Sequence, residues 1–374
     1  MYFDLNDEQR QIKETAHEFL TARYKSDRVR ELIETEHGFE QSDWEEMAGL
    51  GWPGLALPEE WGGQGLGAVE LAVVFEEMGY TIAPSPLLST TVAGLALTEN
   101  GTDQQRDEFL RPLASGEQRG TVALFDAGTQ ARIGEFTMDA ESSGDGLTLN
   151  GEKVLVMDAA AADFMLVATS DGRRHIVPTD AEGVTITPEQ SIDLTRRLHS
   201  VRFDGVQVPA AMTLQGAQEE YLPVLARACV AVSAELTGVS QRCLEMSVQY
   251  AGERQQFGRP IGSYQAVSHR CAEMLMETEN SRSLTYYAAW TADAEPETLR
   301  HAASMAKAYA SDAGWHVADN AIQVHGGIGF TWEHDLHFFL KRARADAAAF
   351  GDARWHRERV AGDVLEAALE PAVA

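Results

Sequence analysis

The sequence predicts an α+β protein in three domains, arranged in the order helical, β-rich, helical. Its 374 residues are too many for one small core and suit two or three domains. Apolar residues follow a helical period up to about residue 117, then short β-rich runs to 213, then long helical stretches to 374. We therefore predict domains at 1–117, 118–213 and 214–374.

The first domain is expected to be mostly helical. A helix around 44–50 should end at Gly51. The segment LPEEWGGQGLG (57–67) is predicted to be a loop, and ELAVVFEEMGY (70–80) a helix closed by Gly79. Near the N-terminus, apolar residues recur at helical spacing at Leu5, Ile12, Ala16, Phe19 and Leu20.

The middle domain is expected to be all-β, as a small barrel or sandwich. Six runs rich in apolar and β-branched residues are separated by Gly, Asp, Asn and Pro, and no convincing helical pattern interrupts them. The runs are TVALF, GLTLNGEKVLVM, FMLVAT, RRHIVPT, GVTITP and HSVRFDGVQVP.

The third domain is expected to be a helix bundle, because long Ala-, Glu-, Gln- and Arg-rich stretches are separated by Gly and Pro. The predicted helices cover 219–252, 264–292, 297–325, 331–347 and 353–371.

Charge and composition exclude several classes of function. The chain carries 58 Asp and Glu against 30 Lys and Arg, a formal net charge of -28, which would repel a nucleic-acid backbone. Its 3 cysteines are too few for a disulfide framework and lack a metal-binding spacing. The N-terminus lacks the features of a secretory signal, and no apolar run is expected to approach the roughly 20 residues of a membrane span. We expect a cytoplasmic protein with no nucleic-acid or membrane partner.

The segment GERQQFGRPIGSYQAV (252–267) is the first candidate binding site. It joins two predicted helices by a tight connection and places Arg254 and Arg259 in an otherwise acidic chain. Arginine recognises phosphate through paired hydrogen bonds, so an anionic ligand is one interpretation. In the alternative, these arginines cap helix carbonyls or pair with neighbouring glutamates.

The second candidate is QVHGGIGFTWEHDLHFFLKRARAD (323–346). Gln323 precedes three glycines in four positions, which would let a nucleotide approach the backbone closely. The alternative is a plain glycine cap between two helices. His325, His334 and His337 lack the spacing of a known metal motif, so no metal site is expected.

The chain resembles the acyl-CoA dehydrogenases, flavoproteins that remove two hydrogens from the α and β carbons of acyl-CoA thioesters. The likeness runs the whole length and is most specific in the two candidate segments. It is also carried by LPEEWGGQGLGAVELAVVFEEMG (57–79), LNGEKVLVMDAAAADFMLV (149–167) and VQVPAAMTLQG (206–216). The family fold is an N-terminal helical domain, a middle β-barrel and a C-terminal four-helix bundle.

The resemblance implies an FAD cofactor, an acyl-CoA substrate and an electron-transfer flavoprotein as electron acceptor. In the family, the two candidate segments reach across to the flavin of a neighbouring subunit. Arg254 would meet the FAD pyrophosphate, and the 323–327 backbone its adenosine half. The implied FAD contacts are Arg254, Gln255, Gln256, Phe257, Gln265, Gln323, Val324, His325, Gly326 and Gly327.

The catalytic base of the family is missing from this sequence. The reaction needs a base, usually a glutamate, that takes the α-proton while a hydride leaves the β carbon. Members carry the base at one of two positions. In this chain the first is Gly351, and the second lies near Ala228, in a stretch without a carboxylate. Asp352 is the nearest candidate base, and the cap of the last helix is its alternative role. Glu235 lies one or two helical turns beyond Ala228.

The middle segment TVALFDAGTQARIGEF (121–136) also lacks the Gly-Ser-Asp with which most members contact flavin and substrate. Four interpretations follow. The chain is a homo-oligomeric dehydrogenase with Asp352 as its base, or one subunit of a heterotetramer whose related partner carries the glutamate and most of the FAD site. In the third interpretation the chain is a non-catalytic subunit. In the fourth it catalyses another flavin reaction on this fold, such as nitroalkane oxidation. A degenerate middle segment beside an intact cross-subunit motif favours the heterotetramer, acting on a bulky or medium-to-long acyl-CoA.

Overall fold

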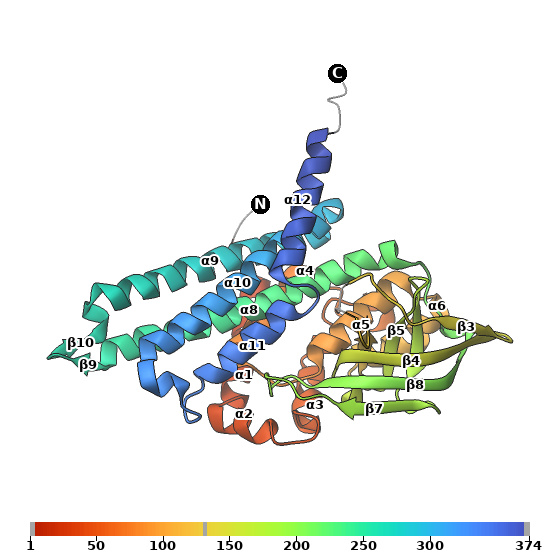
Figure 1. Cartoon of the computed structure of the whole chain (residues 1–374), viewed down its shortest axis with the longest axis horizontal. Coiled ribbons are helices and arrows are strands. Elements are labelled where there is room, and N and C mark those ends of the chain that lie inside the picture. The colour runs from red at the N-terminus through yellow and green to blue at the C-terminus, as the bar shows by residue number, and fades with distance from the viewer. Residues whose placement is uncertain (1–3, 130–132, 370–374) are drawn as a thin grey trace. The chain divides into compact units, whose positions relative to one another are not determined.

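The computed structural model describes residues 4–129 and 133–369. Its elements run in the order helical, β, helical (Figure 1), which confirms the predicted fold class. The chain divides into two compact units. The first unit comprises 1–29, 68–83 and 229–374, and the second comprises 30–67 and 84–228. The division into three domains at 117 and 213 stays a prediction.

The first unit is a helical assembly. Its helices are α1 (Asp7–Arg23), α4 (Ala68–Thr81), the larger part of α8 (Gln218–Glu253), α9 (Gln265–Ala294), α10 (Leu299–His325), α11 (Leu336–Ala348) and α12 (Ala353–Leu369). The five long helices predicted after 214 are confirmed with one change. The fourth begins at Leu336, because 331–335 forms turns and bends after the 3-10 helix at 326–330. Residues 370 and 371 of the last predicted helix lie outside the described residues.

Gly79 does not end its helix, so that prediction is wrong. The helix α4 continues to Thr81, and Gly79 lies where α4 crosses α8. A methyl group on Gly79 would be 2.0 Å from the carbonyl oxygen of Glu235, and one on Gly238 would be 1.8 Å from that of Glu76. Glycine is needed at both positions because two helix backbones touch there.

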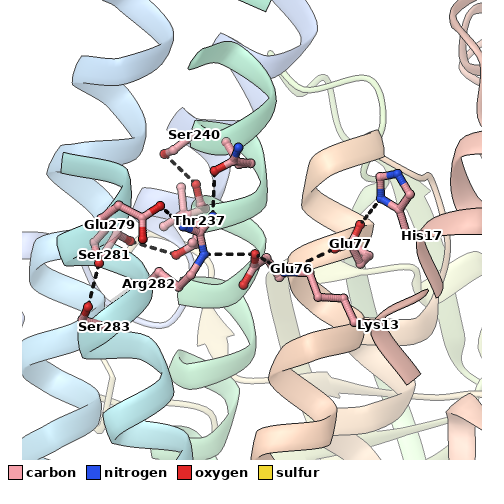
Figure 2. Close-up of polar contacts among 12 residues, drawn as sticks. Lys13, His17, Glu76, Glu77, Thr237, Ser240, Glu279, Ser281, Arg282 and Ser283 are labelled. Atoms are coloured by element: carbon pink, nitrogen blue, oxygen red, sulfur yellow. Dashed lines mark hydrogen bonds and ion pairs between the residues drawn. The ribbon is translucent and has the colours of Figure 1, made fainter. Parts of the chain in front are cut away.

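A buried polar network lies beside this crossing and ties α4 to α1 and α9 (Figure 2). Glu76 Oε1 is 3.0 Å from Lys13 Nζ and 3.2 Å from Arg282 Nε. Glu77 Oε2 is 2.8 Å from His17 Nδ1. Burial would raise the pKa of Glu76, but the charges of Lys13 and Arg282 hold it below its usual value. The carboxylate of Glu76 therefore stays ionised inside the helical unit.

The second unit holds the two larger sheets and further helices of the N-terminal half, chiefly α3 (Gln41–Gly49) and α5 (Leu87–Asn100). The three-stranded sheet has the order β1 (Gly120–Ala123), β5 (Phe164–Ala168), β6 (Arg174–Pro178). The five-stranded sheet has the order β2 (Phe125–Asp126), β4 (Gly146–Met157), β8 (Leu198–Pro209), β7 (Val184–Pro188), with β3 (Ala140–Ser143) paired to β4.

Each of the six predicted β runs contains a strand. The sequence Ala-Glu-Ser-Ser of β3 was missed because its residues are mostly exposed and polar and show no alternation. Both sheets contribute to one apolar core, which includes Ala123 and Val167 from the smaller sheet and Leu149, Val201 and Phe203 from the larger one.

The helix α8 is more apolar than the sequence analysis expected. By length and composition it could cross a membrane, and it is the one such helix among residues 4–129 and 133–369. Within its apolar window, 89% of the residues are buried. The apolar run therefore belongs to the protein core.

Candidate functional site

The connection after α8 is a short, exposed hairpin. Strands β9 (Gln255–Gln256) and β10 (Arg259–Pro260) pair antiparallel, with Gln256 opposite Arg259. Phe257 and Gly258 form the turn, and both have a positive φ, 53° and 78°. Such two-residue turns suit the twist of a hairpin. Phe257 has a left-handed backbone, which is uncommon for a residue other than glycine. Its side chain points into solvent, because 93% of the residue is exposed.

The predicted FAD contacts of this hairpin all lie on the surface. Arg254, Gln255 and Gln256 are exposed, and so is Gln265 at the start of α9. Arg254 has no ion pair within the part of the chain that the structure describes. The alternative role, pairing with a neighbouring glutamate, is thus not what the structure shows.

The other arginine of the segment stabilises the hairpin itself. The guanidinium carbon of Arg259 lies 4.0 Å from the ring centroid of Tyr264, and the Tyr264 hydroxyl donates to the carbonyl of Gln256 over 3.2 Å. At the base of the hairpin, the amide of Ile261 donates to the carbonyl of Arg254 over 2.8 Å. The hairpin is therefore held in one shape before any partner binds.

The glycine end of α10 leaves its backbone open. Gly326 has φ 62° and ψ -137°, a conformation that only glycine adopts readily. A methyl group on Gly326 or Gly327 would meet no atom within 4 Å. Gln323 and Gly327 are exposed, whereas the side chains of Val324 and His325 are buried. A ligand can reach this segment through its backbone and through Gln323.

The end of α8, just before the first candidate segment, packs against the second candidate segment. The ring of Tyr250, near the end of α8, stacks on His325 with centroids 4.4 Å apart. His325 Nδ1 is 2.8 Å from the carbonyl oxygen of Ala321. Burial lowers the pKa of His325, and the neighbouring His334 lowers it further. His325 is thus a neutral packing ring that joins α8 to α10.

Two exposed aromatic side chains follow the glycine end of α10. Phe330 is 78% exposed and Trp332 is 52% exposed, and the ammonium of Lys341 lies 5.0 Å from a Trp332 ring centroid. Their signal in the sequence was the apolar pair in GFTW, directly after the glycines. Exposed rings, an unpaired arginine and an open backbone together fit a flat, polyanionic group such as a dinucleotide.

Asp352 caps a helix. Its Oδ1 accepts a hydrogen bond from the amide of Trp355 over 2.8 Å, at the start of α12. The side chain is exposed. The preceding turn is left-handed at both Phe350 and Gly351, with φ 54° and 100°.

Three buried side chains hold that turn by its carbonyl groups. Lys307 Nζ donates to the carbonyl of Gly351 over 3.0 Å, and His356 Nε2 donates to that of Phe350 over 3.0 Å. Cys229 Sγ lies 3.6 Å from the same Phe350 oxygen. Burial lowers the pKa of Lys307 to about 8 and that of His356 to about 3, and it raises the pKa of Cys229 to about 11.

The resemblance implies a base either at Gly351 or near Ala228, and Cys229 links these two stretches. Cys229 directly follows Ala228 on α8, and it contacts the turn that contains Gly351. Glu235, the other carboxylate considered from the sequence, is 1% exposed and lies 3.6 Å from Arg342 Nη1 in a buried ion pair. Ala228 and Gly351 carry no carboxylate, and the contact beside them is made by the buried thiol of Cys229.

In the middle segment (121–136), the carboxylate of Asp126 is held by local contacts. Asp126 lies 2.7 Å from the buried Lys153 Nζ and accepts from the amide of Thr137 over 2.7 Å. Residues 130–132 of this segment lie outside the described residues. In the rest of it, the polar groups serve local structure within the second unit.

Histidines do not gather into a metal centre in the part of the chain that the structure describes, where no group of three or more His, Cys, Asp or Glu could hold a metal ion. His337 Nε2 is 3.3 Å from the carbonyl oxygen of Trp332, and its ring stacks on that indole.

Comparisons with known proteins agree along the whole chain. Residues 6–117 match the acyl-CoA dehydrogenase N-terminal domain, and 223–365 match the acyl-CoA dehydrogenase C-terminal domain. The acyl-CoA dehydrogenase IpdE2 of Mycolicibacterium smegmatis is 32% identical over 362 residues, which are 96% of this chain and 100% of that protein.

Two similar solved structures carry the names of two chains in their descriptions. The ChsE4-ChsE5 complex from Mycobacterium tuberculosis is 28% identical with a TM-score of 0.89, over 98% of this chain and 99% of that one. A variant of the steroid ACAD Tcur3481-Tcur3483 is 31% identical with a TM-score of 0.88, over 97% and 99% of the two chains.

Proposed function

The chain belongs to the acyl-CoA dehydrogenase family, FAD-dependent oxidoreductases that act on acyl-CoA, and we propose that it is one subunit of a heterotetramer with a related acyl-CoA dehydrogenase subunit. It would complete the FAD site of that partner, which would carry the catalytic base. The observation that carries this proposal is a contrast: Arg254 and the backbone at Gly326 and Gly327 are open to a ligand, while Asp352 caps a helix and Glu235 is in a buried ion pair.

The base region supports a catalytic role for the partner subunit. A general base must reach the proton that it removes and must not be committed elsewhere. Asp352 accepts a helix-capping hydrogen bond, and Glu235 is buried against Arg342. The positions of Gly351 and Ala228 supply no group that accepts a proton.

The motif surface supports a role in holding FAD. When bound, FAD supplies the hydride acceptor for the β carbon. Arg254 would pair with the pyrophosphate, because its guanidinium is exposed and has no ion pair in the described residues. Gly326 and Gly327 would admit the adenosine half to the backbone. Val324 and His325 would take part through their backbone alone, since their side chains are buried. The remaining proposed contacts are Gln255, Gln256, Phe257, Gln265 and Gln323.

The substrate and electron acceptor are inferred from similar proteins. A steroid ACAD and the ChsE4-ChsE5 complex are among the similar structures, which favours a bulky acyl-CoA, such as a sterol side chain, and a two-chain assembly. We expect electrons to pass to an electron-transfer flavoprotein in the cytoplasm. A homo-oligomer remains the competing arrangement, and the experiment below decides between the two.

The test is to purify the chain alone and together with the product of any neighbouring gene for a related acyl-CoA dehydrogenase subunit. We expect little FAD in the chain alone and a stable complex with about one FAD for each pair of chains when both are present. Absorbance at the flavin bands gives the FAD content, and mass measurement in solution gives the assembly. Dehydrogenase turnover on acyl-CoA should require both chains.

A single outcome would contradict this proposal directly. If the chain alone purifies as a yellow homo-oligomer with one FAD per chain and turns over acyl-CoA, it carries its own complete site. Turnover of nitroalkanes by the chain alone would identify the other flavin reaction on this fold.

A further inference from the structure

A pocket lies within the first unit, beside the second candidate segment, which contributes Asp335, Phe338 and Phe339 to its lining. Its volume is about 320 Å³, within the range of small-molecule sites. Residues from α1, α4, α8, α11 and the segment after α1 line it. Its apolar lining includes Ile82, Met246, Phe338 and Phe339. A ligand with an apolar body would therefore find a matching surface.

Two cations line this pocket although the whole chain carries a net charge of -28. They are Lys25, which is exposed, and Arg242, which is half-buried on α8. Neither has an ion pair within residues 4–129 and 133–369. The one acid of the lining, Asp335, accepts a hydrogen bond from Ser26 over 2.7 Å. Unpaired cations beside an apolar surface favour an anionic group on the ligand.

Arg242 is held in place by an aromatic neighbour. Its Nη1 donates to the hydroxyl oxygen of Tyr80 over 3.2 Å, and its guanidinium carbon lies 5.3 Å from the Tyr80 ring centroid. The Tyr80 hydroxyl in turn donates to Glu245 over 2.5 Å. The guanidinium is thus oriented before a ligand arrives, and its other N–H groups can meet a carboxylate in a paired geometry.

The pocket also contains a strained residue. Ile82 follows the end of α4 and has φ 46°, although β-branched side chains strongly disfavour a left-handed backbone. Its side chain is 3% exposed and lines the pocket wall. Such strain is found at sites that the surrounding structure has been built to maintain.

We propose that this pocket binds a small amphipathic carboxylate. Lys25 and Arg242 would hold the carboxylate, and Ile82, Met246 and the two phenylalanines would receive its apolar body. None of the proposed FAD contacts lines this pocket, and neither does Asp352 or Glu235, so the site does not depend on the proposed heterotetramer.

Calorimetric titration of the full chain with hexanoate tests the site. We expect saturable binding of hexanoate and at least about tenfold weaker binding of hexanamide, which has the same body without the charge. Equal binding of the two compounds, or no saturable binding of hexanoate at millimolar concentration, would overturn the proposal.

Two variants locate the binding. Lys25→Glu should weaken hexanoate binding by at least about tenfold, because a like charge replaces an exposed cation that folding does not require. Arg242→Gln should do the same. Arg344→Gln is the matched control, since Arg344 is exposed on α11 outside the pocket and should bind hexanoate like the parent chain. Unchanged binding in Lys25→Glu would place hexanoate elsewhere and refute this site.

Discussion

Asp352 has two possible roles, helix cap and catalytic base, and the turnover of Asp352→Asn distinguishes them. On the structure it caps α12. Asparagine also accepts a hydrogen bond at this position, so Asp352→Asn should leave turnover of the proposed two-chain enzyme unchanged. Asp352→Ala should lower the free energy of unfolding by about 1 kcal/mol, measured in urea.

A catalytic Asp352 would behave differently. Loss of a general base lowers turnover by roughly 10²- to 10⁴-fold. If Asp352→Asn kept its stability but lost turnover on that scale, Asp352 would be the base and the partner would not be needed for it.

Arg254 is the residue on which the proposed cross-subunit FAD site most depends. Arg254→Glu should weaken FAD binding by the two-chain complex by at least about tenfold, since a carboxylate would face the pyrophosphate. The measurement is FAD retained after gel filtration. Arg344→Glu, at an exposed position on α11, should keep its FAD. Full FAD occupancy in Arg254→Glu would remove this residue from the site.

His356 makes the stability of the chain sensitive to acid. Burial lowers its folded pKa from 6.5 to about 3, so between these values the unfolded chain binds a proton that the folded chain does not. Stability should therefore fall as pH drops from about 6.5 towards 3. In His356→Gln, the slope of unfolding free energy against pH in this window should be shallower by up to ~1.4 kcal/mol per pH unit.

The control for this pH dependence is His269, which is exposed on α9. His269→Gln should keep the parent slope, because that side chain meets water in both states. A parent-like slope in His356→Gln would show that other groups govern the acid response.

At the scale of elements, the crossing of α4 and α8 decides whether the helical unit forms. Gly238→Ala should lower the free energy of unfolding by roughly 3 kcal/mol or more, because its methyl group would lie 1.8 Å from the carbonyl oxygen of Glu76. Thermal and urea unfolding measure this cost.

A second glycine of α8 provides the matched control. A methyl group on Gly252 would meet nothing within 4 Å. Gly252→Ala should be neutral or raise the free energy of unfolding by about 0.5–1 kcal/mol, because alanine is the better helix former. Similar losses in both variants would mean that helix crossing is not the reason for Gly238.

The element scale also shows what local patterns predict well. Strands and long helices were located from periodicity because neighbouring residues alone set that signal. The end of α4 was misplaced because Gly79 has the sequence signature of a helix stop, while its role depends on Glu235, which is far away along the chain.

At the scale of the whole molecule, the net charge of -28 opposes the compact state. Raising NaCl from low concentration to about 0.5 M should raise the midpoint of thermal unfolding by a few degrees, because salt screens this repulsion. Equal concentrations of KCl should act alike. A midpoint that stays constant or falls with salt would show that local ion pairs, such as Lys13 with Glu76, outweigh the overall charge.

The sequence by itself determined the order of the helices and strands, and it pointed to the two segments proposed for FAD and to the lack of a carboxylate at Gly351 and near Ala228. These follow from residue type and spacing, which are local properties. Only the tertiary structure decided that Tyr250 on α8 stacks on His325, and that Asp352 caps α12. It also placed Cys229 against the turn at Gly351. Such contacts join residues distant in sequence, and packing of whole helices rather than any local pattern brings them together.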